Sequence, residues 1–395
     1  MTNKARDTPQ GKSRSSYTID DFELDSSKGD IPLTTSNVRV GLIGTSWFAG
    51  MFHIPLTQSH EGVDLVSICG RDKTNADEIA AQHGIENVYT DYRTLVDSDD
   101  LDAVIVATPD DCHHEMTLYA LRAGKHILCE KPMASTVAEA EEMTVLAEQA
   151  GVVNMINFTW RWMPFYTYIR ELIAEGTIGK LFYLNIAYKS SHGIEHQGWR
   201  FDADRAAGVL GDLGSHVIHV ANLLAGEVAA VSANLRPYSA PQPDQAVPDN
   251  PANTSAALIM DYANGVHGML HASAATHLGN RGQEQRVEIA GSDATLTGVM
   301  DMFNPDRIYL SRRGQDDVEE LAVPDRLWGD VDRSIGKFDQ GMEFFSKMSV
   351  GPRLFVDTIL NEAKSEPSFR DGLHVQRVID AALESDRTGQ KIEIG

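Results

Sequence analysis

The sequence predicts an α/β protein whose first part is a doubly wound parallel sheet and whose second part is an α+β domain. Three observations support this prediction. Between Val38 and Ala150, short apolar runs alternate with helical stretches, as in parallel strands joined by crossover helices. A glycine turn, Gly41–Ala49, directly follows the first apolar run. Beyond Phe158 the runs are longer and meet at hairpin turns, which is typical of antiparallel sheets.

The predicted strands of the first part are short apolar runs, namely Val38–Ile43, Asp64–Cys69, Ala103–Ala107 and His126–Cys129. The predicted helices that follow them cover Thr74–His83, Glu115–Ala123 and Val137–Ala150. The last two helices stop at Gly124 and Gly151, since glycine readily adopts the left-handed conformation that closes a helix. This order predicts a parallel sheet whose carboxyl edge binds a ligand.

The second part combines helices with longer alternating strands. A helix and a half-buried strand are predicted first, over Pro164–Glu175 and Leu181–Tyr188. Two hairpins follow, in which Ser255–Asp261 pairs with Val266–Ser273 and Arg286–Ala290 pairs with Ala294–Thr297. Their turns contain Asn264-Gly265 and Gly291-Ser292-Asp293, and the first is a strong two-residue hairpin signal. The five prolines of Pro237–Pro251 predict a loop.

Composition excludes several classes of partner. The formal net charge of −23 argues against nucleic acids and anionic membrane surfaces. No apolar run approaches the ~18 residues of a membrane helix, and residues 1–37 lack the apolar core of an export signal. The three cysteines, Cys69, Cys112 and Cys129, show no metal-binding or redox spacing and indicate a reducing compartment. We therefore expect a cytoplasmic protein with a small-molecule partner.

The turn after the first strand has the features of a dinucleotide site. Backbone amides at the start of a helix, together with the helix dipole, suit a pyrophosphate. The residues expected to line it are Gly44, Thr45, Ser46, Trp47 and Phe48. Ser46 stands where a second glycine is usual; it narrows the approach of the diphosphate, although its hydroxyl can donate to a phosphate oxygen.

The end of the second strand bears on the choice of cofactor. NAD-binding proteins carry an acid there for the ribose hydroxyls, but this chain reads Gly70-Arg71-Asp72. Gly70 leaves room for a 2′-phosphate, and the Arg71 guanidinium can pair with it. The sequence therefore favours NADP. In the alternative, Asp72 binds the ribose and the cofactor is NAD.

Two motifs carry the candidate catalytic residues. Glu130-Lys131-Pro132 ends the fourth predicted strand, at the carboxyl edge of the sheet. In Gly208–His216, Asp212 and His216 are four residues apart and share one face of a helix. An imidazole, with an ordinary pKa near ~6.5, suits the base that takes the proton of an alcohol. Lys131 would stabilise the alkoxide, and Asp212 would orient the hydroxyl or the imidazolium. The pattern predicts a metal-free alcohol dehydrogenase.

These motifs, with Ala107–His113 and the terminal segment Phe369–Gly389, resemble the glucose–fructose oxidoreductase, inositol dehydrogenase and rhizopine-catabolism (Gfo/Idh/MocA) family over about residues 38 to 395. The resemblance implies a Rossmann domain with NAD(P) in its cleft. It also implies an open mixed, largely antiparallel sheet that supports a homo-oligomer, a dimer or a tetramer. Lys131, Asp212 and His216 then form the catalytic group. Glu130-Lys131-Pro132 lines the nicotinamide pocket, often with a cis bond before the proline.

Further site residues follow from the resemblance or from residue type. On the cofactor side they are Thr108, Pro109, Asp110, His113, Glu130 and Arg161, and on the substrate side they are Tyr188, Trp199 and Arg200. Arg161 contacts cofactor or substrate, or pairs with an interdomain acid; Tyr188 is a wall of the sugar site or a core residue. Asp110 stands where the family has asparagine, and His219 stands where aspartate is common, which we expect to affect only helix packing.

We therefore predict a polar arm (residues 1–37), a Rossmann dinucleotide-binding domain (38–158) and an α+β substrate-binding and oligomerisation domain (159–395). The predicted function is hydride transfer between NAD(P) and a secondary alcohol of a sugar, polyol or related cyclic alcohol. The alternatives are NAD-dependent glycoside hydrolysis through transient oxidation, and a non-catalytic nucleotide sensor. His192–His196 matches a zinc pattern, but its serine and glycine neighbours predict a loop, so we expect no metal site.

Overall fold

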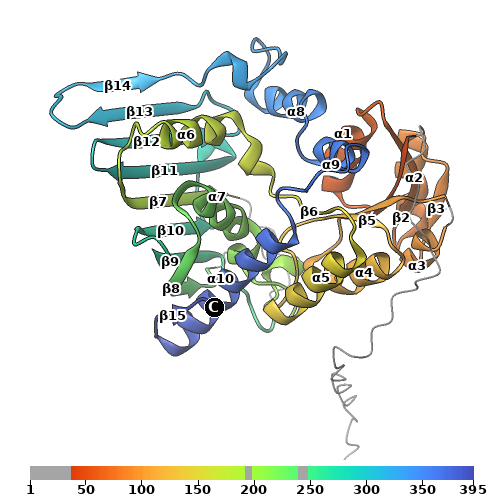
Figure 1. Ribbon diagram of the computed structural model, residues 1–395. Coiled ribbons are helices and arrows are strands. Elements are labelled where there is room, and N and C mark those ends of the chain that lie inside the picture. The colour runs from red at the N-terminus through yellow and green to blue at the C-terminus, as the bar shows by residue number, and fades with distance from the viewer. Residues whose placement is uncertain (1–36, 99, 192–197, 239–247) are drawn as a thin grey trace, which may run out of the picture. The chain divides into compact units, whose positions relative to one another are not determined.

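The computed structural model describes residues 37–98, 100–191, 198–238 and 248–395 (Figure 1). Nearly all of the predicted polar arm and the whole of the His192–His196 motif lie outside these residues. Most of the predicted proline-rich loop lies outside them as well.

The first sheet is parallel, with the strand order β3-β2-β1-β4-β5-β6. Its strands are β1 (Val38–Ile43), β2 (Val63–Cys69), β3 (Asn87–Tyr89), β4 (Ala103–Val106), β5 (His126–Cys129) and β6 (Asn154–Ile156). This is the order of a doubly wound dinucleotide-binding sheet, and the direction of winding reverses between β1 and β4. The short strands β3 and β6 were not predicted.

The helices of the first part are α1 (Ile54–Gln58), α2 (Lys73–His83), α3 (Tyr92–Val96), α4 (Asp110–Arg122) and α5 (Val137–Ala150). Side chains cap three of them: Asp72 accepts from the backbone nitrogen of Thr74 at 2.9 Å, Asp91 from that of Arg93 at 3.0 Å, and Thr136 from that of Glu139. The predicted closing glycine Gly151 has a φ of 65°. Helices α4 and α5 lie side by side (Figure 1).

The second sheet has the order β14-β13-β12-β11-β7-β10-β9-β8-β15. Its strands are β7 (Leu181–Ser190), β8 (Val228–Arg236), β9 (Ser255–Tyr262), β10 (His267–Ser273), β11 (Gln283–Gly291), β12 (Ala294–Asp301), β13 (Arg307–Arg312), β14 (Val318–Leu321) and β15 (Ile392–Glu393). Only the pairing of β7 with β10 is parallel among these strands, so the sheet is mixed and largely antiparallel. Both predicted hairpins are present, as β9–β10 and β11–β12. The predicted fold class is confirmed.

The longer helices of the second part are α6 (Pro164–Ala174), α7 (Ser215–Ala225), α8 (Lys337–Lys347), α9 (Pro352–Leu360) and α10 (Phe369–Thr388). Figure 1 shows α6, α7 and α10 against one face of the second sheet. The buried side chains of that face, such as Leu184 and Ile186 of β7, join the helices in one hydrophobic core. Residues of the opposite face alternate with them and remain more exposed.

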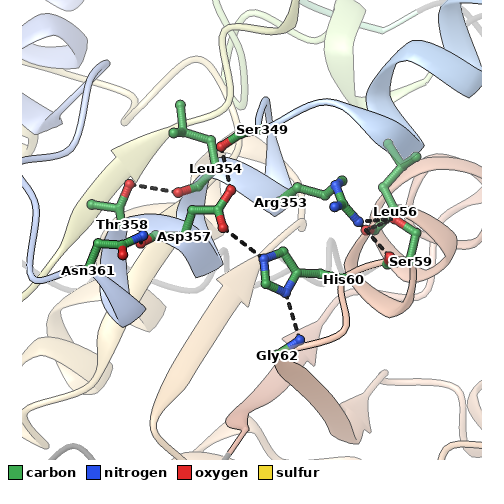
Figure 2. Close-up of polar contacts among 10 residues, drawn as sticks. All are labelled: Leu56, Ser59, His60, Gly62, Ser349, Arg353, Leu354, Asp357, Thr358 and Asn361. Carbon is green, nitrogen blue, oxygen red and sulfur yellow. Dashed lines mark hydrogen bonds and ion pairs between the residues drawn. The ribbon is translucent and has the colours of Figure 1, made fainter. Parts of the chain in front are cut away.

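Helix α9 returns to the first part of the molecule. Its buried residues Phe355, Val356 and Ile359 share a core with Val40 and Leu42 of β1. Polar contacts join α9 to the end of α1, as Figure 2 shows. His60 lies 2.9 Å from an Asp357 carboxylate oxygen through Nε2 and accepts from the backbone nitrogen of Gly62 through Nδ1, also at 2.9 Å. The chain therefore completes the first core with residues from near its end.

Candidate active site

The first glycine turn brings the end of β1 against the end of β4. Gly44 has a φ of 135°, and a Cβ atom there would lie 2.3 Å from the carbonyl oxygen of Ala107. No other residue fits this approach. Ser46 accepts a hydrogen bond from the backbone nitrogen of Ala49 at 3.2 Å, and Trp47 is 75% exposed. The helix that follows opens as a π-helix over Ala49–His53, before α1 begins.

The end of β2 contains the residues that bear on cofactor choice. A Cβ at Gly70 would lie 2.4 Å from the Thr45 side chain, so the two turns are in close contact. The Asp72 carboxylate accepts from the backbone nitrogens of Thr74 and Asn75, at 2.9 and 3.3 Å, and caps α2. Arg71 beside it is exposed.

The segment after β4 fits a bound nucleotide, because it presents a buried polar atom. Thr108 Oγ1 is buried and has no hydrogen-bond partner within the described residues. Pro109 precedes α4, and Asp110 is the first residue of that helix. The orphan hydroxyl and the close approach at Gly44 fit the dinucleotide that the turn predicts.

His113 connects this segment to the loop that carries Lys131. Its Nδ1 lies 2.9 Å from the carbonyl oxygen of Pro132, and its Nε2 lies 2.9 Å from that of Thr108. Both ring nitrogens must donate to satisfy two carbonyls, so the ring is protonated. Burial by itself lowers the pKa of His113, but the Cys129 sulfur and the two carbonyls raise it to about 9. The Lys131–Pro132 peptide is cis, as the resemblance implies.

The structure brings Lys131, Asp212 and His216 together, as predicted from the two motifs. Lys131 Nζ donates to the carbonyl oxygen of Asp212 at 2.8 Å and to its carboxylate at 2.9 Å. The Arg200 Nε atom lies 3.6 Å from the same carboxylate, so Arg200 joins the group. Asp212 lies in a π-helical turn, Leu210–Gly214, and His216 lies in the first turn of α7. This wider turn replaces the simple α-helix that the spacing predicted.

The electrostatic environment gives the acid and the imidazole different charge states. Burial raises the pKa of Asp212, but Lys131 and Arg200 outweigh burial and lower it to about 2. Burial, with Lys131 adding to it, lowers the pKa of His216 well below 6.5. The ordinary imidazole pKa assumed from the sequence is therefore wrong for this site, because the ring is enclosed beside a cation. At neutral pH the site holds a carboxylate and a neutral imidazole.

Aromatic rings surround His216. Its ring centroid lies 6.5 Å from that of Phe158, 6.3 Å from that of Trp160 and 6.2 Å from that of Tyr188. His216 Nδ1 is buried and has no partner within the described residues. Tyr188 is itself buried, and its hydroxyl donates to Gln283. It therefore contacts the candidate base and is also a core residue.

Arg161 and Trp199 take different positions. The Arg161 guanidinium is buried, with Nη1 3.1 Å from Nε2 of His219 and Nη2 3.8 Å from Glu366. The contact with Glu366 fits the second of the two alternatives for Arg161, pairing with an acid, and no contact joins Arg161 to the Lys131 group within the described residues. His219 stacks on Phe158 at 4.3 Å, in agreement with a packing role. Trp199 lies under Arg200, whose guanidinium is 4.4 Å from the ring centroid.

Sequence reasoning missed a buried cluster around Glu130. Glu130 Oε1 contacts His53 Nε2 at 2.8 Å and accepts from Asn157 Nδ2 at 2.6 Å. Burial raises the pKa of Glu130, but His53, Lys131 and Asn157 together lower it to about 2. His53 is fully buried and follows the glycine turn, so the cluster links the predicted cofactor turn to the Lys131 loop. No sequence spacing relates positions 77 residues apart.

The described part of the chain contains neither a metal-binding cluster nor a membrane-spanning helix. It has no group of three or more His, Cys, Asp or Glu side chains arranged to hold a metal ion. None of its helices combines the length and the apolar character needed to cross a membrane. The His192–His196 motif, at which we expected a loop and no metal, lies outside the described residues.

Comparison with known proteins agrees with the geometry. Levoglucosan dehydrogenase of Pseudarthrobacter phenanthrenivorans is 29% identical over 343 residues, covering 78% of this chain and 84% of that protein. The scyllo-inositol 2-dehydrogenase (NADP(+)) IolW of Bacillus subtilis is 25% identical over 360 residues, covering 90% and 95%. A solved levoglucosan dehydrogenase in complex with NADH and levoglucosan superposes with a TM-score of 0.78 at 26% identity, covering 91% of this chain and all of that chain.

Family models cover most of the sequence. Residues 38–158 match the "Oxidoreductase family, NAD-binding Rossmann fold" and residues 170–394 match the "Oxidoreductase family, C-terminal alpha/beta domain". The resemblance predicted from the motifs is thereby confirmed, and the protein belongs to the Gfo/Idh/MocA family of oxidoreductases.

Proposed function

We propose that the protein oxidises a secondary alcohol of a sugar, polyol or related cyclic alcohol at the Lys131–Asp212–His216 group, with NAD(P) as the hydride acceptor. Family membership and the Rossmann sheet support an NAD(P)-dependent oxidoreductase acting on a CH–OH group. The observation that carries the proposal is the convergence of the three residues at the carboxyl edge of that sheet.

The residues divide the work of alcohol oxidation. When bound, the nicotinamide supplies the hydride acceptor. His216 is neutral in the ligand-free site and takes the hydroxyl proton. The charge of Lys131 stabilises the alkoxide that develops, and Asp212 holds Lys131 in place through two hydrogen bonds. The rings of Phe158, Trp160 and Tyr188 keep water away from the imidazole.

The cofactor residues follow from the same edge of the sheet. Gly44 and Thr108 would hold the dinucleotide through the close turn and the orphan hydroxyl, and Thr45–Phe48, Pro109, His113 and Glu130 complete the lining. Within NAD(P), we favour NADP. Two features support this choice: Arg71 is exposed beside Gly70, and the Asp72 carboxylate is used to cap α2. Both cofactors occur among similar proteins: one relative is named as an NADP(+) dehydrogenase, and solved levoglucosan dehydrogenase structures contain NADH.

The substrate side is proposed to include Arg200 and Trp199 beside the catalytic group. Arg200 contacts Asp212 and stacks on Trp199, so a guanidinium and an aromatic face adjoin the catalytic group, and both kinds of group suit the binding of polyol rings. Arg161 is the weakest of the proposed ligand residues, because it is engaged with His219 and Glu366.

We also propose a homo-oligomer, a dimer or tetramer, in a cytoplasmic location. The face of the second sheet that carries no helices exposes Ile259 and Met269, which are cross-strand neighbours 59% and 54% exposed. A second copy would bury this apolar pair. Light scattering of Ile259→Asp, compared with wild type, tests the interface.

The cytoplasmic proposal is supported by Cys69, Cys112 and Cys129, which are all free.

The direct test is a screen of sugars and polyols with NAD and NADP, following the absorbance of the reduced nicotinamide. A dehydrogenase accumulates reduced cofactor in proportion to substrate consumed. A glycoside hydrolase regenerates its cofactor and shows no net reduction, and a sensor binds nucleotide without turnover. The relatives named above are dehydrogenases, and they give no support to those two alternatives.

A further inference from the structure

Asp110 is a buried carboxyl group for which the site provides no partner. It is 7% exposed, and neither a hydrogen bond nor an ion pair within the described residues engages it. It is the first residue of α4, which follows the carboxyl end of β4. The nearby Lys131 is already bonded to Asp212. Burying an unpaired carboxylate costs free energy. This side chain is therefore either protonated or completed by a hydrogen-bond donor from a ligand.

The charged groups that face Asp110 come from four elements. They are Asp111 on its own helix, Lys131 after β5, Asp212 in the π-helical turn and Arg200 in the short helix Trp199–Phe201. Burial is the largest influence on the pKa of Asp110; Lys131 and Arg200 oppose it, Asp212 and Asp111 add to it, and the pKa rises to about 8. At neutral pH Asp110 is therefore a neutral carboxyl group that faces two cations, Lys131 and Arg200, and two carboxylates, Asp212 and Asp111.

We propose that Asp110 accepts a hydrogen bond from a hydroxyl group of the bound ligand and releases its own proton to solvent as it does so. The proposal rests on the proposed function, because the ligand hydroxyl is either a ribose hydroxyl of NAD(P) or a hydroxyl of the sugar substrate. Once a hydroxyl donates to Asp110, Lys131, Arg200 and the N-terminus of α4 all favour its charged form.

Thr108, two residues earlier, supplies a second observation. Its Oγ1 is also buried without a partner within the described residues. Two orphan polar groups on one segment, at the edge where the sheet binds nucleotides, indicate that a ligand completes both. An asparagine, the residue expected at this position from the family, has no proton to release. The proton linkage is therefore a property of the aspartate in this chain.

Calorimetry in buffers of different ionisation enthalpy tests the proposal, because the heat then reports the protons released. Reduced cofactor is titrated first, and sugars and polyols are then titrated into the cofactor-loaded protein. We expect wild type to release about one proton per site at neutral pH in one of the two titrations. Release with cofactor identifies the ribose as the source of the hydroxyl, and release with the second ligand identifies the substrate.

Asp110→Asn and Asp111→Asn form a matched pair. Asp111 is the adjacent carboxylate, is partly exposed and is paired with Arg205 at 2.8 Å. We expect Asp111→Asn to release the proton as wild type does and Asp110→Asn to release almost none. In Asp110→Asn the ligand affinity should no longer rise with pH between about 6 and 8, the range set by linkage to this carboxyl group. Equal proton release in wild type and Asp110→Asn, or none in wild type, overturns the proposal.

Unfolding of the ligand-free protein gives a readout that needs no ligand. A carboxyl pKa raised by folding stabilises the fold at low pH, and this contribution is lost as pH rises towards the folded value of about 8. The midpoint of Asp110→Asn should therefore rise relative to wild type as pH increases from 5 to 8. A constant difference means that Asp110 holds no proton, which overturns the proposal. If instead neither cofactor binds wild type while this trend is present, the proposed function fails and the proton on Asp110 stands.

Discussion

Lys131 donates hydrogen bonds to both the backbone carbonyl and the carboxylate of Asp212, at 2.8 and 2.9 Å, across 81 residues of sequence. Lys131 follows β5 of the first sheet, and Asp212 lies in the turn that opens α7 of the second part. The pair therefore fixes the cation of one part against the acid of the other. The buried His216 lies one turn beyond, where both charges act on its pKa.

His216→Ala should remove the proton acceptor and lower alcohol oxidation by at least about a hundredfold, the scale of a general base. The wild-type rate should lose activity only well below pH 6.5, because burial and Lys131 lower the pKa of this imidazole. The measurement is the pH–rate profile of kcat/KM. An acidic limb that persists unchanged in His216→Ala would show that another group is the base.

Asp212→Asn should lower turnover far more than it weakens cofactor binding. The carboxylate holds Lys131 and offsets its charge, and its low pKa keeps it ionised down to about pH 2 in the folded protein. Steady-state kinetics and cofactor titration on the same preparation separate the two effects. A variant with the wild-type rate would reduce Asp212 to a structural acid.

Arg71→Ala should weaken NADP binding by about 1.5–3 kcal/mol, the range of a hydrogen bond to a charged group. NAD binding should change much less, because NAD lacks the 2′-phosphate that the guanidinium would hold. Fluorescence titration of both reduced cofactors gives the comparison. Tighter NAD binding in wild type, with both cofactors affected alike by Arg71→Ala, would make NAD the cofactor.

Asp357→Asn should lower the free energy of unfolding by about 1–2 kcal/mol, since it removes the bond from His60 and leaves α9 less firmly attached to α1 (Figure 2). Burial raises the pKa of Asp357, but Ser349 and His60 lower it below its usual value. The carboxylate therefore stabilises the fold above the unfolded pKa, and the deficit of Asp357→Asn should shrink as pH falls through the acid range.

The control for that measurement is Asp77→Asn. Asp77 pairs with Lys73 on the exposed surface of α2, where an ion pair contributes little. Denaturant unfolding should show no more than a few tenths of a kcal/mol of change for Asp77→Asn. Equal losses for the two variants would mean that the contact of His60 with Asp357 has no special part in holding α9.

The sequence predicted the elements that depend on short stretches of neighbouring residues. The apolar run Val38–Ile43 is β1 without adjustment, and the Asn264-Gly265 turn joins β9 to β10. Helix α4 begins at Asp110, five residues before its predicted start. The sequence contained a signal for this earlier start, because acidic residues in the first turn favour a helix N-terminus. The strands β3 and β6 were missed because three residues carry too little periodicity.

Features that depend on contacts between residues far apart in the chain could not be predicted from the sequence. Helix α9 returns to the first core because Phe355, Val356 and Ile359 pack against β1. No local sequence pattern predicts this contact. The His53–Glu130 contact joins two turns that only the closed sheet brings together. The low pKa of His216 likewise depends on enclosure by residues from several elements. The motifs predicted which side chains converge, and tertiary packing determined their charge states.

The most direct test of the Lys131–Asp212–His216 account is the turnover of Lys131→Met against wild type, with the best substrate from the sugar and polyol screen. The variant removes one positive charge and keeps the unbranched stem of the side chain. We expect cofactor affinity within several-fold of wild type and a loss of at least about a hundredfold in kcat, as for other transition-state charges. Near-normal turnover in Lys131→Met would remove Lys131 from the mechanism.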